Sequence, residues 1–390
     1  MRTYGLPSAM IFIYCLASVL LPVFIINKLL YVPLILCSLW VAFTKPVRTL
    51  APPLVFLVFL YGFLLSLLTN SDFALAKQML LGSSTLFFVY LIADQGINMT
   101  SILRRVGIIF AALMSFMSLM ILWLPSAPIS VALLNFYSVH ELGFYGVRQF
   151  GGLQMFMLHH RSSPFLLVPL SLFFASFMAG RRRDIVWVAL IALCIFFTAS
   201  RALMLTAAVA MFALFLYKAK WQARLATLLL VVPALVGGVM HLWLSTTMFS
   251  ASETSNSIKL GHLLSFYQTL DVPTLLFGNG SGNYFFTEGY DRWVSQTEIT
   301  WMDAIRFFGL PLSLLLATAI LFPTGTLSLK TWDKISARTI IFVYLLMSFS
   351  NPVLFNSFGF IVVVWYWSVL LQYDSKHVEV FNRKKGLVNA

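Results

Sequence analysis

The chain has 390 residues, of which 60% are hydrophobic and only 10% are charged. Soluble domains carry about 25% charged residues, so the composition excludes an ordinary soluble protein and predicts one that crosses a membrane several times. The formal net charge of +13 is typical of basic cytoplasmic loops and of contact with anionic lipids, and it gives no reason to expect nucleic acid as a partner.

Twelve apolar stretches can be drawn, and several of them are near the length of about 20 helical residues that a bilayer requires. In chain order they are 9–26, 29–44, 50–69, 75–93, 106–124, 164–180, 185–200, 202–217, 225–243, 304–322, 338–350 and 356–373. The sequence shows no internal repeat, no low-complexity tract and no soluble domain. The sequence therefore predicts an all-α fold: one transmembrane domain over 1–390, a polytopic helical bundle of about twelve transmembrane helices.

The connections between these stretches differ in charge, and this difference predicts their orientation because lysine and arginine concentrate in cytoplasmic loops. With the N-terminus inside, 18 of the 26 lysines and arginines fall in the inside connections, against 5 of the 13 acids. Both termini are therefore predicted to be cytoplasmic. The two long polar connections, 125–163 and 244–303, are then predicted to be outside loops.

The cytoplasmic connections and the cysteines exclude several kinds of site. The connections are short and basic, with no Walker sequence, kinase loop or nucleotide fingerprint, which argues against an ATP-driven machine. Cys15, Cys37 and Cys194 all lie in apolar runs. They show no CxxC or Cys/His spacing, so neither a disulfide framework nor a structural zinc site is predicted. The first apolar run is interpreted as a retained anchor.

The first candidate site residue is Arg201, at the outer end of the seventh stretch. An arginine between two hydrophobic helices is costly unless it is paired or faces water. One interpretation is an anion ligand, assisted by the free N–H groups of the helix that begins beside it. The other is a helix-end side chain that reaches the interface. Composition leaves both open.

The first long outside loop contains Arg148 and Arg161, and Arg161 lies just before Pro164, a residue that suits a helix start. Arginine binds phosphate and carboxylate with a planar fork, so both are substrate-binding candidates. His159 and His160 resemble a metal pair, but neighbouring residues of a helix do not face one way and no third ligand is evident. No metal is predicted, and His159 is kept as a binding candidate.

The second long outside loop contains Gly278, Gly280 and Gly282, followed by Tyr284. The glycines lack the strand–helix context of a dinucleotide motif. They are interpreted either as a flexible turn or as backbone that approaches a phosphate or sugar closely. Most aromatic residues of both loops fit an interfacial belt, but some could stack on sugar rings, and Tyr284 is kept as a binding candidate.

Charged residues surround these glycines. Lys259 and His262 precede them, and Glu298 follows, just before the next apolar stretch. Asp303 and Arg306 are spaced i, i+3 and are expected to pair with each other, which makes Arg306 a weaker site candidate. A large anionic lipid-linked ligand suits such a set better than an ion does, because ion pathways favour acids or broken helices at mid-membrane.

At these residues the chain resembles the O-antigen polymerase and ligase superfamily, the Wzy-type and WaaL-type membrane glycosyltransferases of bacterial envelopes. The matching pieces cover about 160–315, under half of the chain. They are Phe197-Thr198-Ala199-Ser200-Arg201-Ala202-Leu203, Leu276-Phe277-Gly278-Asn279-Gly280-Ser281-Gly282, Glu298 with Phe308-Gly309-Leu310-Pro311, and more weakly Arg161-Ser162-Ser163-Pro164.

The resemblance implies a GT-C-like bundle in the bacterial inner membrane, with the active site at its periplasmic loops. It implies undecaprenyl-pyrophosphate-linked glycan as donor and acceptor, no metal or cofactor, and a chain-length regulator as a protein partner. By matching position, Arg201 and Arg161 would hold the pyrophosphate. The catalytic candidates are Glu298, Arg201 and His262, with Glu298 as the group that takes the acceptor proton.

Two alternatives remain beside a polymerase. A ligase would transfer the same donor to lipid A–core, but ligases carry a histidine–asparagine pair where this chain has Thr297-Glu298, which favours the polymerase. A flippase for lipid-linked oligosaccharide would be expected to show internal repeats and mid-membrane substrate contacts, and the sequence shows neither.

The orientation is testable with reporter fusions. Fusions after Arg183 and after Ser255 are expected to report opposite sides of the membrane, because the charge bias places the first inside and the second outside. Alkaline phosphatase and green fluorescent protein activities measure the two sides. The same side for both fusions would overturn the predicted topology.

Overall fold

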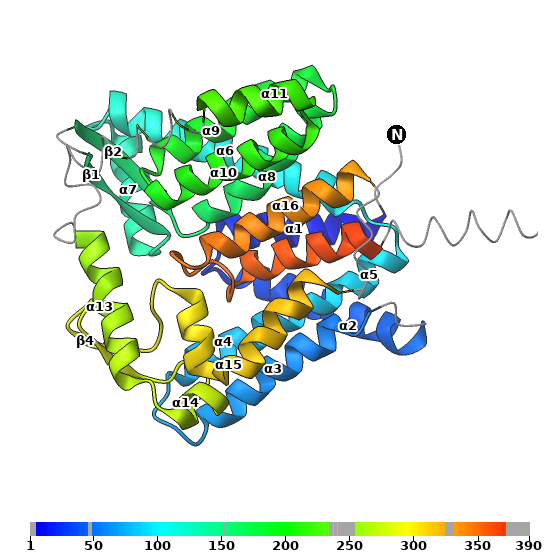
Figure 1. Ribbon diagram of the computed structural model, residues 1–390, viewed down its shortest axis with the longest axis vertical. Helices are drawn as coiled ribbons and strands as arrows, with labels where there is room; N and C mark the ends of the chain where they lie inside the picture. The colour runs from blue at the N-terminus through cyan, green and yellow to red at the C-terminus, as the bar shows by residue number, and fades with distance from the viewer. Residues whose placement is uncertain are drawn as a thin grey trace, which may run out of the picture.

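The computed structural model describes residues 5–45, 49–150, 153–231, 254–323 and 331–371, together with residues 233, 237 and 240. Over these residues the chain forms a bundle of helices that run alongside one another, with two small β-hairpins at one end (Figure 1).

The helices before the first hairpin are α1 (Leu6–Leu20), α2 (Ile25–Thr44), α3 (Ala51–Ser66), α4 (Phe73–Ser84), α5 (Phe88–Asp94), α6 (Met99–Trp123) and α7 (Pro128–Val139). Then follow β1 (Gly143–Phe150), β2 (Leu153–His160), α8 (Leu167–Met178), α9 (Ile185–Phe197), α10 (Arg201–Lys218) and α11 (Trp221–Ala226). The C-terminal part contains α13 (Thr254–Thr269), α14 (Val272–Phe277), β3 (Phe285–Thr287), β4 (Arg292–Val294), α15 (Thr300–Leu321), α16 (Trp332–Met347) and a final helix, Ser357–Leu371.

Five helical segments of the described chain are long and apolar enough to cross a membrane: α2, the continuous segment Phe73–Asp94, α6, α10 and α15. Five shorter apolar helices accompany them. These features fit a helical membrane protein, as the composition predicts. The number of about twelve spans stays a prediction, because about half of the predicted stretch 225–243 lies outside the described residues.

The final helix is the centre of the bundle. Trp365, Tyr366 and Trp367 follow one another in it and are all fully buried. Their polar atoms have partners: the Trp367 indole N–H donates to the Ile320 carbonyl at 2.9 Å, and the Tyr366 hydroxyl donates to the Leu321 carbonyl at 2.7 Å. A helix buried on every side must satisfy such groups internally, and these bonds tie it to the end of α15.

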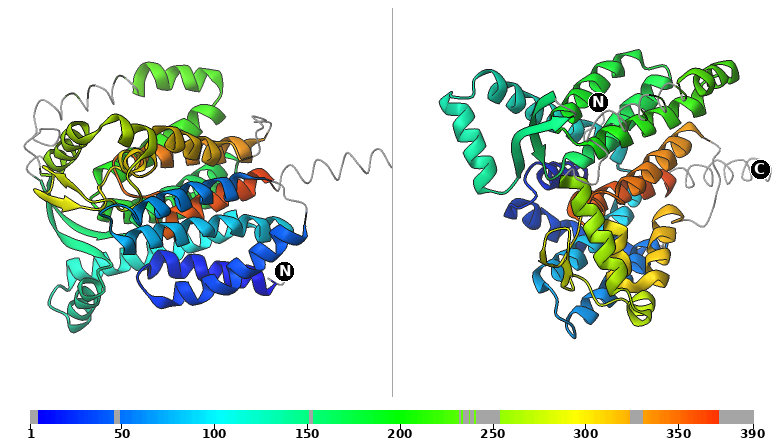
Figure 2. Two further views of the ribbon diagram at one scale, coloured as in Figure 1. Left: turned by 90° about the horizontal axis from the view of Figure 1, so that it is seen from below. Right: turned by 60° about the vertical axis from the view of Figure 1, so that its left-hand side comes forward.

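The two long polar connections of the sequence meet at one end of the bundle. Figures 1 and 2 show both hairpins, α7 and α13 at this end, while the first residues of α1 and the last residues of the final helix lie at the other. Residues far apart in the sequence can therefore share one site here.

The prediction of an all-α fold is wrong in these connections. The segment 125–163 forms α7 and the antiparallel hairpin β1–β2, and 244–303 contains the hairpin β3–β4 as well as two helices. In the first hairpin Phe150 pairs with Leu153, so the connection is the dipeptide Gly151-Gly152. The paired runs contain aromatic and β-branched residues, which favour strands, but the sequence interpretation treated the whole segment as a loop.

The second connection is attached to the bundle through a break in α15. Gly309 interrupts this helix with φ 76°, and Pro311, which has no N–H, leaves the Phe307 carbonyl without its helical donor. The N–H of Gly280 supplies a bond to this carbonyl at 3.1 Å. The irregular helix and the glycine stretch thus complete each other's backbone hydrogen bonds.

Gly278, Gly280 and Gly282 are glycines because of this attachment. All three have positive φ, 73°, 90° and 70°. A Cβ at Gly278 would lie 2.5 Å from a carbonyl oxygen of α15. At Gly280 it would lie 2.6 Å from a backbone nitrogen of α3, and at Gly282 2.8 Å from the carbonyl oxygen of the α4 N-cap. Only glycine permits both the conformation and the close approach.

This packing predicts a graded response to alanine. Gly146→Ala meets open space and is expected to leave the melting temperature in detergent unchanged. Gly96→Ala adds only the strain of φ 61° in open space, about 1–2 kcal/mol. Gly280→Ala adds a backbone clash to the strain and is expected to lower the melting temperature most. An unchanged melting temperature in Gly280→Ala would contradict the attachment.

Candidate functional site

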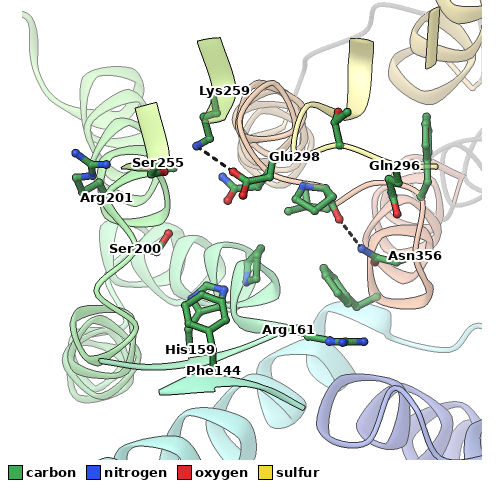
Figure 3. Close-up of a pocket in the computed structure, with 18 of the residues that line it drawn as sticks. Phe144, His159, Arg161, Ser200, Arg201, Ser255, Lys259, Gln296, Glu298 and Asn356 are labelled. Carbon is green, nitrogen blue, oxygen red and sulfur yellow. Dashed lines mark hydrogen bonds and ion pairs between the residues drawn. The ribbon is translucent and has the colours of Figure 1, made fainter. Parts of the chain in front are cut away.

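A cavity of about 1110 Å³ opens at the end of the bundle where the two hairpins lie (Figure 3). Its walls include strands β1 and β2, the start of α10, the side of α13, the stretch before α15 and the connection before the final helix. We refer to it as the main cavity. A space of this size accommodates a ligand larger than an ion.

The main cavity collects most of the charged candidates. Among the described residues its lining contains four cations, Arg148, Arg161, Arg201 and Lys259, and one carboxylate, Glu298. Four cations against one carboxylate leave a formal excess of three positive charges. Clefts lined by one sign of charge concentrate ligands of the other, so this space favours an anion.

The wall that carries Arg201 is fixed by a tight turn between α9 and α10. Helix α10 begins at Arg201, one residue before the predicted stretch 202–217, and the Ser200 hydroxyl caps it by accepting from the Leu203 N–H at 3.4 Å. Ala199 lies in this turn at φ 47°. The Arg148 guanidinium donates to the Ala199 carbonyl at 3.2 Å, so the hairpin holds the turn that positions Arg201.

His159 and His160 face opposite sides of β2, as successive strand residues do. His159 lines the main cavity and stacks on Phe144, with ring centroids 4.7 Å apart. Burial lowers its pKa to about 4, so it is neutral at pH 7. In the buried His160, Nδ1 accepts from the Ser162 N–H at 3.0 Å and Nε2 donates to the Leu20 carbonyl at 3.3 Å. The two rings do not converge on a common point.

Glu298 is the acidic group of the main cavity. Its Oε1 accepts from the Tyr290 hydroxyl at 3.1 Å, and its Oε2 lies 3.7 Å from the Lys259 Nζ (Figure 3). Burial, together with the charge of Glu298, raises the pKa of Tyr290 to about 12, so the phenol remains a donor at neutral pH. The carboxylate is held from two sides and still faces the cavity, where it can accept a proton from a bound hydroxyl.

The position of this glutamate depends on the buried pair Asp303–Arg306, whose charged atoms lie 3.0 Å apart as the i, i+3 spacing predicts. The second Asp303 oxygen accepts from the Thr297 N–H at 2.8 Å and from its hydroxyl at 3.1 Å. Arg306 donates to the carbonyls of Ser295 (2.9 Å) and Asn283. The pair thus holds Asn283, Ser295 and Thr297 in place. Because Glu298 directly follows Thr297, the pair also fixes the position of this cavity glutamate.

His262 does not line the main cavity, although the sequence makes it a catalytic candidate. It is fully buried, and its Nδ1 lies 2.6 Å from the Thr287 hydroxyl. Burial lowers its pKa. Its ring packs edge-to-face on Tyr290, with centroids 4.7 Å apart. It therefore contacts the tyrosine that holds the carboxylate, rather than the space in front of that carboxylate.

Lys259 lines the main cavity, but the other binding candidates of the second loop, the three glycines and Tyr284, lie outside it. Gly278, Gly280 and Gly282 are packed against α3, α4 and α15 and line neither this cavity nor its neighbour. Tyr284 lines the neighbouring hollow.

The sequence interpretation missed the connection before the final helix. Asn351 and Asn356 both line the main cavity, as does Gln296 from the opposite wall. The Asn351 carbonyl accepts from the Thr300 hydroxyl at 2.9 Å, and the Asn356 side chain caps the final helix by accepting from the Gly359 N–H at 2.8 Å. An asparagine N-cap before an apolar run is a recognisable pattern, but nothing local indicates that it lines a cavity.

Comparison with known proteins gives one distant likeness. No family model matches the chain. A curated relative, the O-antigen polymerase of Shigella flexneri, is 26% identical over 151 residues, which are 35% of this chain and 35% of that protein. The chain thus aligns with about a third of this relative's length. The likeness supports the O-antigen polymerase family weakly and suggests a glycosyltransferase-type enzyme with a role in O-antigen polymerisation.

The buried pair and the cavity glutamate are expected to respond differently to alanine. Asp303→Ala leaves the Arg306 charge buried without its partner, which costs about 3–5 kcal/mol, and we expect a clear fall in melting temperature in detergent. Glu298→Ala removes a side chain that is 34% exposed, and we expect an unchanged melting temperature. Equal stability of the two variants would contradict the structural role of the pair.

Proposed function

We propose that this protein polymerises undecaprenyl-pyrophosphate-linked oligosaccharide repeat units into O-antigen or a similar surface polysaccharide at the periplasmic face of the inner membrane. The main cavity carries the proposal, because it combines an excess of positive charge with one accessible carboxylate at the end of a membrane-type helical bundle. The likeness to an O-antigen polymerase supports it.

The arginines of the cavity suit the pyrophosphate of such a donor. Arg201 begins α10, where free helical N–H groups add to the attraction for an anion. Arg161 pairs with Glu141 at 3.1 Å, but the two side chains are 53% and 75% exposed. Exposed pairs contribute little, so Arg161 can exchange this partner for a phosphate. Neither group requires a metal to neutralise the ligand.

The lipid part of the donor has an apolar wall to follow. Phe196, Met204 and Leu205 line the same cavity as the arginines, and Phe196 and Leu205 are among the exposed large hydrophobic residues. A ligand with a charged head and a hydrocarbon tail matches this combination, whereas a free sugar phosphate would leave the apolar wall in water.

The reaction then needs three roles. An acceptor sugar hydroxyl forms a bond to the anomeric carbon of the donor, and the bond from that carbon to the pyrophosphate oxygen breaks with its electron pair on the oxygen. The Glu298 carboxylate takes the hydroxyl proton. Arg201 and Arg161 stabilise the charge that develops on the departing pyrophosphate.

One contact favours a polymerase over the ligase alternative. The residue at the position of the ligase-type histidine is Thr297, and both its N–H and its hydroxyl donate to the buried carboxylate of Asp303. This side chain is 3% exposed and is committed to the loop. The cavity group at this point is Glu298, so we propose a carboxylate-based reaction.

Variants at Arg201 test the proposal. Arg201→Ala removes a charge-assisted bond of about 2–3 kcal/mol, which would slow the reaction by roughly 30–150-fold. We expect loss of polymer in complementation of a deletion strain, read on a lipopolysaccharide gel. Arg201→Lys keeps the charge but loses the bidentate fork, and we expect it to retain little activity. Arg182→Ala, an exposed arginine outside the cavity, is the control and should restore the full ladder.

Membrane abundance of each variant is measured in parallel. The deletion itself separates the alternatives, because a strain that still caps its lipopolysaccharide with a single repeat unit lacks a polymerase, whereas one that loses all capping and accumulates long lipid-linked polymer lacks a ligase. A full ladder with Arg201→Ala would remove this arginine from the active site.

A further inference from the structure

A second hollow of about 520 Å³ lies beside the main cavity. Its wall is the hairpin β3–β4 on one side and the start of α4 on the other. The two spaces share four lining residues, Leu75, Gln78, Tyr290 and Gln296. The two spaces therefore adjoin each other at these side chains, so neighbouring parts of one elongated ligand can be placed in them.

The charge of the second hollow differs from that of the main cavity. Its described lining contains one carboxylate, Asp72, and one cation, Arg292, so it carries no net charge. The side chain of Asp72 accepts from the Leu75 N–H at 3.0 Å and from the Ser295 hydroxyl at 3.3 Å. A lining of carboxylate, amide, guanidinium and hydroxyl groups without net charge favours an uncharged polar ligand over a phosphate.

The hairpin also presents an aromatic surface. Trp293 on β4 is 64% exposed and lines the hollow. Phe286, its partner on β3, packs edge-to-face beside its ring, with centroids 6.2 Å apart. Arg292 lies over the Tyr290 ring at 5.3 Å. The C–H faces of a pyranose ring are apolar and stack on such rings, while its hydroxyls bond to the polar groups beside them.

We propose that the second hollow is a glycan subsite that holds the acceptor chain beyond its reacting sugar, with Trp293 as the stacking platform. This inference rests on the proposed function. The acceptor is assigned because Tyr290, on the border of the two spaces, donates to Glu298, the group proposed to take the acceptor proton. A glycan whose reacting hydroxyl lies at Glu298 continues past Tyr290 into the hollow.

The test measures binding of a ligand that lacks both lipid and pyrophosphate. The probe is the oligosaccharide released by mild acid from the polysaccharide of the producing strain, added to the purified full-length protein in detergent and followed by saturation-transfer NMR. Trp293→Ala is expected to weaken binding by about tenfold or more, whereas Trp293→Phe keeps an aromatic face and most of the affinity.

Two controls separate the subsite from general effects. Trp221→Ala removes an equally exposed tryptophan, 67% exposed, that lines neither space, and it should bind as the wild type does. Arg201→Ala should also bind normally, because the probe has no pyrophosphate. Melting temperatures verify that each variant is folded.

The outcomes distinguish the two proposals. Wild-type affinity in folded Trp293→Ala, or no binding of the probe by the wild type, overturns the subsite. Normal polysaccharide in the deletion strain overturns the proposed function. Loss of binding in Trp293→Ala together with shortened polymer in the same variant supports the acceptor assignment.

Discussion

The guanidinium of Arg306 is the interaction on which the candidate site depends. It is 3% exposed, pairs with a fully buried Asp303, and donates to the carbonyls of Ser295 and Asn283. Both residues of the pair belong to α15, and their bonds to Asn283, Ser295 and Thr297 attach the loop to this helix. Detachment of the loop would leave these buried polar groups without their hydrogen-bond partners, which is costly. The placement of Glu298 therefore follows from an ion pair in which it takes no part, and this carboxylate remains partly exposed while its support is buried.

The same helix supplies a second attachment through its irregularity. Gly309 and Pro311 break the helical hydrogen bonds of α15, and the freed Phe307 carbonyl is satisfied by the N–H of Gly280. In a regular helix the Phe307 carbonyl would already be hydrogen-bonded within α15, so the loop could have contacted only side chains at this point. Backbone paired with backbone at close range fixes the loop more tightly than flexible side chains do, because fewer rotatable bonds separate the two elements.

Charge and polarity divide the end of the bundle into regions with different ligands. The cationic wall at Arg201 adjoins an apolar strip at Leu205 on the same helix, and the neutral hollow at Trp293 adjoins the main cavity at Tyr290. In the proposed function, the charged, hydrocarbon and sugar parts of one lipid-linked molecule would each contact one of these regions. Interactions in such partly desolvated spaces are stronger than in bulk water, which gives an arrangement of a few side chains enough affinity to orient a large substrate.

The sequence by itself determined the features that depend on neighbouring residues. Hydrophobic length identified apolar helices, the boundary between two apolar stretches located a helix start beside Arg201, and the i, i+3 spacing identified the pair that contains Arg306. Only the tertiary structure decided what depends on contacts between distant segments. In the structure, His262 contacts Tyr290 and does not line the main cavity, and the loop glycines are packed against neighbouring helices. A segment predicted as a loop forms a hairpin, and the connection before the final helix lines the cavity. Local spacing fixes helix starts and short-range pairs, but which face of a distant segment meets another is set by packing that no single stretch of sequence contains.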